Sequence, residues 1–483
     1  MKEYIANYGY IRYEQTRELI SSIKTSYILT KMMMISRLVR LSKRQLHTIV
    51  SREIIKPSSP TPSHLKTHNL SWLDQITINT FMPMVVFYPN NGIYGSSHGK
   101  ILDLKNSLSQ TLTKYYPFAG RHADIAPSHV DCNDDGAELL EASVSITLSD
   151  FLQKSQHEDL DQFFPNDLTW NKGNRKGYDI QSDGVIPLAI QVNHFECGGM
   201  VVAVSLSHKI ADGSSLAHFF NDWAKVTRFC SREQKQEFPI DPRFIPFQNI
   251  NMNFDGISFE VSNDCITRSF MFPNSKINDL KNKVKTMTAE SGQPITNPTR
   301  VEVLNWLLYK CSVAAATKNN PGSCRPTGVG HLINKRNKMM EPLPENAIGN
   351  MYFIMEILKS TESEMKPESF IGELKKQKMQ FHRLRNIENA FGLLSKMSSE
   401  TTFEEQKRKI DGAYICTSLC GYPAYEIDFG WGKPVKVTVG GNLRKNSFIL
   451  MDAPNGDGIE ALVCLGKQDM AIIQTDPELL EFC

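Results

Sequence analysis

The spacing of apolar residues changes at His208, and this change marks the most informative part of the sequence. Residues 186–207 hold two apolar runs separated by a Cys-Gly-Gly turn, which is typical of two buried strands. After residue 208 the apolar side chains follow the spacing of an amphipathic helix: Leu216, Phe219, Phe220 and Trp223. The pattern therefore predicts that His208 ends a strand and that a helix follows, with Asp212, Ser214 or Ser215 as its N-cap.

Strand-like and helix-like segments alternate through the rest of the chain, which predicts an α/β fold. The expected elements are a short helix or turn followed by a strand in 70–90, a helix in 101–121, two strands in 128–144, helices in 299–316 and 369–397, and strands in 434–441, 447–454 and 458–465. Residues 229–250 are charged and contain prolines, so we interpret them as a connection between two halves.

Composition narrows the class of protein without pointing to one function. The 483 residues carry a net charge of +2 and are 41% hydrophobic, which favours a globular chain without the basic field of a nucleic-acid-binding protein. No window has the roughly 20 apolar residues of a membrane span. The ten cysteines are scattered and lack zinc-ligand spacing. We therefore expect reduced thiols, no metal and a monomer located in the cytoplasm.

Residues 1–48 differ from the rest of the chain. They carry nine Lys and Arg against three Glu, and all three acids precede Leu19. An acid-poor start of this kind occurs in organelle transit peptides, but it also fits a non-native or dispensable extension, and a structural role is a third alternative. The interpretation we favour is a disordered extension whose removal leaves stability and activity unchanged.

His208 and Asp212 are the candidate chemical groups of the predicted turn. A histidine at a strand end can act as a general base, since its ordinary pKa of ~6.5 lies near cellular pH, or it can be a structural residue. Asp212 can orient the imidazole, as in a catalytic triad, or it can turn away and pair with a distant arginine. No G-x-S-x-G nucleophile motif stands next to these residues, which favours direct transfer over a covalent intermediate.

A second unusual segment lies far downstream, where Phe429, Gly430, Trp431 and Gly432 alternate large side chains with glycine. This alternation predicts a tightly bent loop in which the glycines let the backbone approach closely while the tryptophan packs. Asp428, which precedes the loop, could be a base, but an ion-pair or capping role within the loop is the stronger interpretation.

The two segments together, "HKIADG" at 208–213 and "DFGWG" at 428–432, resemble the paired signatures of the plant BAHD acyl-CoA acyltransferases. Further stretches over about residues 50–480 resemble the alkaloid- and alcohol-acetylating branch of that family: "KPSSPTP", "LSWLDQ", "YYPFAGR", "VDCNDDG", "FECGG", "AIGN" and "GDGIEALVCLGKQDM". The resemblance implies two similar-sized α/β domains of the chloramphenicol acetyltransferase type, each with a mixed sheet, and a channel between them. The implied division is 49–228, a crossover at 229–250, and 251–483.

The resemblance also implies roles for single residues. His208 would be the general base, and Asp212 would pair with Arg336 of "INKRNK" instead of with the imidazole. Asn350 in "AIGN" and Thr417 in "CTSLC" match positions near the reaction centre, so they are candidate oxyanion donors. The segment from Asp428 to Gly432 would be structural. Acyl-CoA, expected to be acetyl-CoA, would be a co-substrate, with no permanently bound cofactor and no metal.

Three residues depart from the usual pattern of the family. Leu419 stands where relatives carry Trp, Gly421 where they carry Arg, and Lys335 where they carry Leu. The first two put the identity of the acceptor in doubt more than the reaction. We expect a hydroxyl of a specialised plant metabolite as the acceptor. An amine acceptor, or a catalytically lapsed protein that only binds ligand, is the alternative, and the presence of both His208 and Asp212 argues against the lapsed protein.

Overall fold

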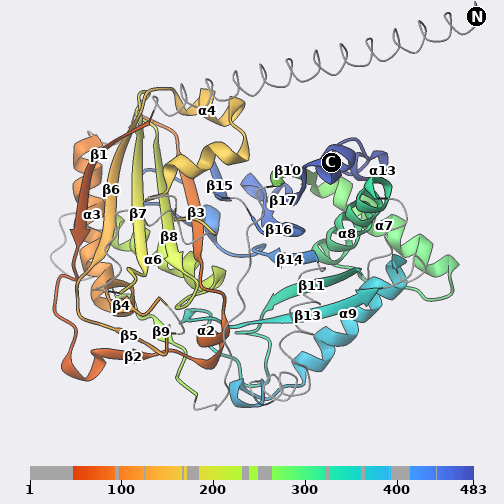
Figure 1. The fold of residues 1–483 in the computed structure, drawn as a ribbon, viewed down its shortest axis with the longest axis horizontal. Coiled ribbons are helices and arrows are strands. Elements are labelled where there is room, and N and C mark those ends of the chain that lie inside the picture. The colour runs from red at the N-terminus through yellow and green to blue at the C-terminus, as the bar shows by residue number, and fades with distance from the viewer. Residues whose placement is uncertain are drawn as a thin grey trace, which may run out of the picture.

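The computed structural model of the protein contains two six-stranded mixed β-sheets with helices on their outer sides (Figure 1). It describes residues 47–92, 97–124, 127–165, 168–170, 184–230, 239–248, 264–320, 327–359, 365–390, 392, 414–441 and 443–483. The expectation about residues 1–46 lies outside this set. His47 and Thr48 of the predicted extension instead begin strand β1, and His47 is anchored because its Nε2 is 3.0 Å from Asn193 Oδ1.

The first sheet holds the strand that leads to His208. Its strand order is β1 (His47–Ile55), β6 (Ala137–Val144), β7 (Leu188–Phe195), β8 (Met200–Ser207), β3 (Phe81–Tyr88) and β15 (Lys436–Val439). The pair β6–β7 is parallel and the other pairs are antiparallel. Two long helices, α3 (Ser97–Lys114) and α6 (Gly213–Cys230), pack against each other on one side of this sheet.

Short elements complete the first half of the chain. They are helices α2 (Trp72–Ile76) and α4 (Leu148–Lys154) and a small sheet of β2 (Thr67–Asn69), β5 (His129–Asp131) and β4 (Arg121–His122). The expected strand pair in 128–144 is therefore present but divided between two sheets. The expected helix in 101–121 is α3, which begins four residues earlier and ends at Lys114.

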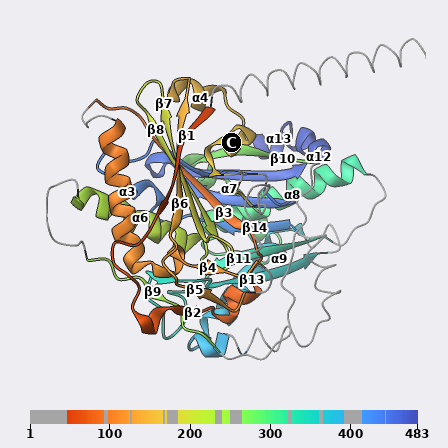
Figure 2. The same cartoon turned by 60° about the vertical axis from the view of Figure 1, so that its left-hand side comes forward.

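The second sheet is mixed as well. Its order is β10 (Cys265–Pro273), β17 (Gly458–Gly466), β16 (Ser447–Asp452), β14 (Tyr414–Ser418), β11 (Thr327–Asn334) and β13 (Tyr352–Lys359), and β14 is parallel to both neighbours. The helices of this half are α7 (Asn274–Glu290), α8 (Arg300–Asn319), α9 (Pro367–His382), α12 (Lys467–Ile473) and α13 (Pro477–Leu480). Figure 2 shows the strands of both sheets between α3 and α6 on one side and α8 on the other.

The predicted division into 49–228 and 251–483 is wrong at one strand. β15 comes from the C-terminal half of the chain, but it pairs antiparallel with β3 at the edge of the first sheet. This pairing supplies hydrogen bonds to a β3 edge that would otherwise be open. The predicted crossover also begins too early, because α6 extends to Cys230. Within it, β9 (Arg243–Phe244) pairs with β12 (Ala347–Ile348), so the connection is anchored to the second half.

The predicted helix over 369–397 is divided, because residues 383–386 interrupt it and residues 387–390 are helical again. α9 ends at His382, because the next backbone carbonyls bond elsewhere: Leu384 and Arg385 accept from the N–H groups of Met340 and Glu341. Residues 393–397 lie outside the described chain. None of the described helices combines the length and the apolar character that crossing a membrane requires.

Candidate active site

His208 lies directly after β8, in the turn that leads into α6. Its backbone N–H donates to the Thr80 carbonyl at 2.8 Å, and its own carbonyl accepts from Asn350 Nδ2 at 2.7 Å. β8 is buried along its whole length, so a side chain at its end is held by a rigid strand. The position predicted from the apolar spacing is therefore confirmed, and the backbone of His208 is anchored on both sides.

The imidazole of His208 has one defined tautomer. Nδ1 lies 2.9 Å from the Ala211 carbonyl, which can only accept, so Nδ1 carries the proton and donates. Nε2 is then the atom with the free lone pair. Burial lowers the pKa of His208 below 6.5, although the nearby Asp212 charge opposes this effect. The neutral imidazole is thus a hydrogen-bond acceptor at Nε2, as a general base requires.

Asp212 pairs with Arg336 and not with the imidazole. The guanidinium contacts the carboxylate with two bonds, from NH1 to Oδ2 at 2.7 Å and from NH2 to Oδ1 at 2.9 Å. Ser215 N–H and Met351 N–H donate to the same carboxylate at 2.9 and 3.0 Å. Burial raises the pKa of Asp212, but the Arg336 charge and these bonds outweigh it, and the net pKa lies below its ordinary value. Asp212 is therefore a charged structural residue and the N-cap of α6.

The Asp212–Arg336 pair joins the two halves of the protein. Arg336 follows β11 in the second half, and its Nε and NH2 also donate to the carbonyls of Ala347 and Gly349. Both partners are nearly inaccessible to solvent, at 7% and 1% of the side-chain surface. A buried pair of this kind has every donor and acceptor used, which makes the loss of either partner costly.

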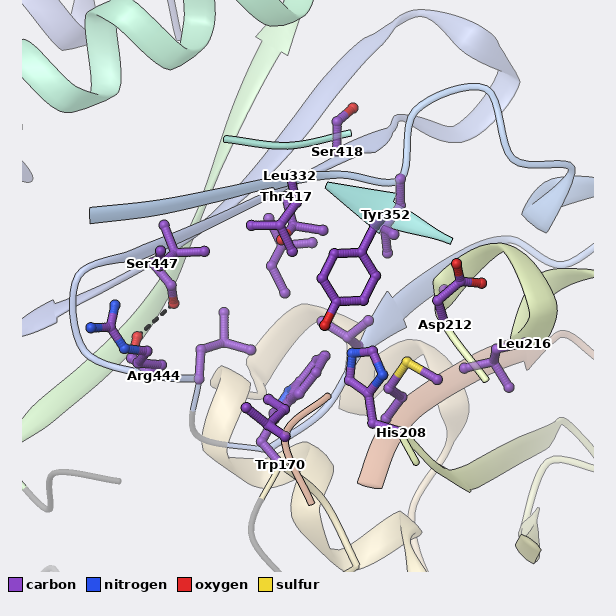
Figure 3. Close-up of a pocket in the computed structure, with 18 of the residues that line it drawn as sticks. Trp170, His208, Asp212, Leu216, Leu332, Tyr352, Thr417, Ser418, Arg444 and Ser447 are labelled. Carbon is purple, nitrogen blue, oxygen red and sulfur yellow. Dashed lines mark hydrogen bonds between the residues drawn. The ribbon is translucent and has the colours of Figure 1, made fainter. Parts of the chain in front are cut away.

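A cavity of about 220 Å³ lies between the two sheets, with His208 in its wall (Figure 3). Its lining comes from both halves of the chain: β3, the His208 turn, β11, β13, β14, β15 and β16. Most lining side chains are apolar, among them Ile76, Met82, Leu216, Ile354, Ile415 and Val439. The cavity is suited to a hydrophobic ligand, and the two-sheet arrangement brings that ligand to the imidazole.

The two candidate oxyanion donors differ in position. Thr417 of β14 lines the cavity, as Figure 3 shows, so it remains a candidate donor. Asn350 does not belong to the described lining, and both hydrogens of its amide are used, by Asp74 Oδ1 at 2.8 Å and by the His208 carbonyl. The prediction of Asn350 as an oxyanion donor is therefore wrong. Asn350 holds the backbone of the base instead.

The residues that depart from the family pattern also have clear positions. Leu419 lines the cavity and packs near Gly213, so this part of the wall is formed by a branched aliphatic side chain. Gly421 is not among the described lining residues. Its N–H donates to Asp452 Oδ2 at 2.6 Å, its φ is +84°, and a Cβ there would meet no neighbour within 4 Å. Of these two departures, only Leu419 changes the wall that an acceptor would contact.

The loop from Asp428 to Gly432 lies away from the cavity. Asp428 Oδ1 accepts from the N–H groups of Gly430 and Gly432 at 2.8 and 2.9 Å, and both glycines have positive φ. Phe429 packs edge-to-face on Trp223 of α6, with ring centroids 4.9 Å apart, and Trp431 packs on Tyr88 of β3. The structural interpretation of Asp428 is confirmed: it caps a loop that ties the C-terminal half to the first sheet.

Two residues near the base were not found from the sequence. Tyr352 of β13 lies beside the imidazole, with ring centroids 5.9 Å apart, and its hydroxyl donates to Thr77 Oγ1 at 3.2 Å. Burial raises the pKa of Tyr352 to about 12, so it stays neutral. Asp74 contacts Asn350 from α2. Its only local signal is the Ser-x-x-Asp capping box in "LSWLDQ", which marks a helix start and no site.

No group of three or more potential metal ligands occurs among the described residues. The described wall of the cavity contains an imidazole, a threonine hydroxyl and many apolar side chains.

Comparison with known proteins agrees with this geometry. Residues 47–480 match the family described as the Transferase family. A 17,18-epoxy-17-hydroxycur-19-ene N-malonyltransferase from Strychnos nux-vomica is 38% identical over 441 residues, which cover 90% of each chain. Deacetylvindoline O-acetyltransferase from Catharanthus roseus is 34% identical over 457 residues, covering 90% of this chain and 97% of the relative.

A solved structure shows the same architecture. The crystal structure of vinorine synthase superimposes with a TM-score of 0.73 at 30% identity, covering 90% of this chain and 98% of that one. The fold expected from the two motifs, with two α/β domains and mixed sheets, is thus confirmed. The family match over nearly the whole described chain, the identities and this superposition lead to one conclusion: the chain belongs to the Transferase family of BAHD acyltransferases.

Proposed function

We propose that this acyltransferase transfers an acetyl group from acetyl-CoA to a hydroxyl group of an apolar polycyclic plant metabolite, such as an alkaloid or terpenoid, and that His208 is the general base. The observation that carries the proposal is the tautomer of His208. Its Nδ1 donates to the Ala211 carbonyl, so Nε2 is an acceptor in the wall of the cavity.

The reaction follows from that acceptor. Nε2 takes the proton of the acceptor hydroxyl as the oxygen attacks the thioester carbonyl. The tetrahedral oxyanion requires a preorganised donor, and the hydroxyl of Thr417 in the cavity wall is our candidate for it. The carbon–sulfur bond then breaks, and the CoA thiolate leaves with the proton that His208 had taken. No residue of the cavity has to form a covalent intermediate.

The lining supports the choice of acceptor. Aliphatic side chains from both sheets surround the cavity, and Trp170 adds an aromatic wall (Figure 3). A rigid polycyclic molecule would bury apolar surface there at about 25 cal/mol per Å² while it presents one hydroxyl to His208. One relative is named as a 17,18-epoxy-17-hydroxycur-19-ene N-malonyltransferase and another as a deacetylvindoline O-acetyltransferase, and these names support an acceptor of this class.

The test is an assay of CoA release with acetyl-CoA and a panel of plant alcohols, with mass detection of the acetylated product. His208→Ala should lower kcat by about 10²–10⁴-fold while the protein stays folded. His194→Ala is the matched control, because His194 lies near the end of the neighbouring strand β7 and outside the described lining. Activity of His208→Ala within a few-fold of the wild type would reject the proposed base.

Two further arms of the assay test the alternatives. An amine analogue of each accepted alcohol tests N-acylation, and faster turnover of the amine would replace the hydroxyl in the proposal. Malonyl-CoA tests the donor, because its terminal carboxylate needs a cation, and Arg444 lies in the cavity wall (Figure 3). We expect acetyl-CoA to be preferred and Arg444→Gln to leave acetyl transfer unchanged. A preference for malonyl-CoA that Arg444→Gln abolishes would overturn the acetyl donor.

A further inference from the structure

The carboxylate of Asp74 has two sets of partners on two different elements. Oδ2 accepts from the N–H and the hydroxyl of Ser71, at 3.0 and 2.6 Å, and so caps the short helix α2. Oδ1 accepts from the N–H and the Nδ2 of Asn350, at 2.7 and 2.8 Å. One oxygen therefore completes a local helix cap, and the other holds a residue 276 positions away in the second half of the chain.

Asn350 connects Asp74 to the main chain of His208. The second hydrogen of its Nδ2 reaches the His208 carbonyl at 2.7 Å. Its Oδ1 is buried and has no hydrogen-bond partner in the described chain, so the amide is oriented entirely by what it donates. An unmet buried acceptor is unfavourable. The cost of the unpaired Oδ1 is offset by the two bonds that the amide donates, one to Asp74 and one to the carbonyl of His208.

The position of the His208 imidazole depends on the position of its main chain. Nδ1 bonds to Ala211 within the same tight turn, and outside that turn the ring lies beside Tyr352 and near the Asn350 side chain, so its position also depends on how the main chain of the turn is held. That main chain is held by the Thr80 carbonyl and by Asn350. Loss of the Asn350 contact would leave the His208 N–H to Thr80 as the remaining direct main-chain anchor of the base. Small displacements of a catalytic group are enough to cost as much as ~10²-fold in rate.

Helix capping alone does not account for this arrangement. α2 has five residues, and a cap for it needs only one of the two oxygens. Glu302 makes the same kind of capping box with Thr299 at the start of α8, but its remaining contacts go to Lys375 and Lys378 and not to the site. The two caps thus offer a natural comparison between a carboxylate that only caps and one that also reaches the base.

We propose that Asp74 is a positioning residue for the general base, acting through Asn350 on the backbone of His208. This inference rests on the proposed role of His208. Burial raises the pKa of Asp74 to about 6, against the opposing hydrogen bonds, so the carboxylate is ionised in most molecules at pH 7.5 and can accept all four donors.

The experiment compares kcat, KM for acetyl-CoA and melting temperature in the full-length enzyme. Asp74→Asn places an amide where four donors converge, and we expect kcat to fall about 10–100-fold with KM unchanged within about threefold. Ser71→Ala removes the hydroxyl that donates to Oδ2 but leaves Oδ1 on Asn350, and Glu302→Gln perturbs the equivalent cap of α8. Both controls should keep kcat within about threefold, whatever they do to the melting temperature.

A double-mutant cycle tests the route from Asp74 to the base. Asp74→Ala and Asn350→Ala should each lower kcat, and the double variant should be no slower than the worse single one, because both remove the same contact. Asn350→Ser tests the same relay in kcat if the Asp74 variants do not fold.

Several results would reject the inference. Additive losses in the cycle, or a kcat of Asp74→Asn or Asn350→Ser within about threefold of the wild type while His208→Ala is inactive, would overturn the positioning role and leave the proposed base intact. An equal fall in kcat for Glu302→Gln would show that the effect is general destabilisation. An active His208→Ala would reject the proposed function itself.

Discussion

Lys335 is a buried ammonium with no hydrogen-bond partner among the residues that the structure describes, and it offers a stability prediction. It follows β11, has no solvent-accessible surface, and its Nζ lies 4.8 Å from the centre of the Phe381 ring. Burial, reinforced by the positive charges of Lys338 and Lys378, lowers the pKa of Lys335 from 10.5 to about 8. At pH 7 the Lys335 side chain is therefore charged in most folded molecules, although burial and the neighbouring lysines disfavour the charged form.

The size of the penalty follows from that shift. A displacement from 10.5 to about 8 is roughly 2.5 pKa units, and at about 1.4 kcal/mol per unit it amounts to about 3 kcal/mol. Lys335→Met removes the charge and keeps a flexible side chain of similar length. The lost contact with the Phe381 ring offsets about 0.5–2 kcal/mol. We expect the variant to be more stable at pH 7 by about 1–3 kcal/mol.

The gain should depend on pH with a definite sign. Because the folded pKa lies below the unfolded one, the penalty is complete below about pH 8 and disappears as the pH rises toward 10.5. The stability of the wild type should thus rise across that window relative to Lys335→Met. The difference between the two proteins should be largest at pH 7 and shrink steadily above pH 8.

Urea unfolding at several pH values measures this difference. Lys378→Met is the control, because Lys378 is partly exposed and donates to Glu302 at 2.8 Å, so its removal should be neutral or destabilising. Two results would refute the reasoning. One is a Lys335→Met protein that is less stable than the wild type at pH 7, and the other is an advantage that stays constant between pH 7 and 10.

Three further predictions concern the site and its support. Because burial lowers the pKa of His208, kcat/KM should stay level from pH 8 to about 6.5 and fall only at lower pH; a decline that begins above pH 7.5 in the CoA-release assay would contradict it. Asp212→Asn and Arg336→Met should each destabilise the protein by about 3–5 kcal/mol in urea unfolding, and additive losses in the double variant would argue against the pair. Gly430→Ala should cost at least about 1 kcal/mol, because its φ is +101°, while KM for the acceptor stays within about twofold; an unchanged melting temperature would show that the loop tolerates a side chain.

The sequence by itself determined the elements around the base. The spacing of apolar residues placed His208 at the end of β8 and the helix after it, and the turn residues offered Asp212, Ser214 or Ser215 as its cap, of which Asp212 is the one that caps α6. The alternation of Phe429 and Trp431 with Gly430 and Gly432 predicted a tightly bent loop in which the tryptophan packs, and the structure has it. These features follow from local causes, namely side-chain period, capping chemistry and backbone freedom, which a short segment carries within itself.

Only the tertiary structure decided which distant groups meet. The residues alone left two partners open for Asp212, and the bonds to Arg336 settle the question. The alternation of apolar and polar residues predicts that β15 is a strand, but this alternation does not indicate which sheet the strand joins. Asn350 was a plausible oxyanion donor until its two amide hydrogens proved to be used by Asp74 and His208. Whether a polar group is free depends on how many of its hydrogen bonds are already made, and those partners come from segments that only folding brings together.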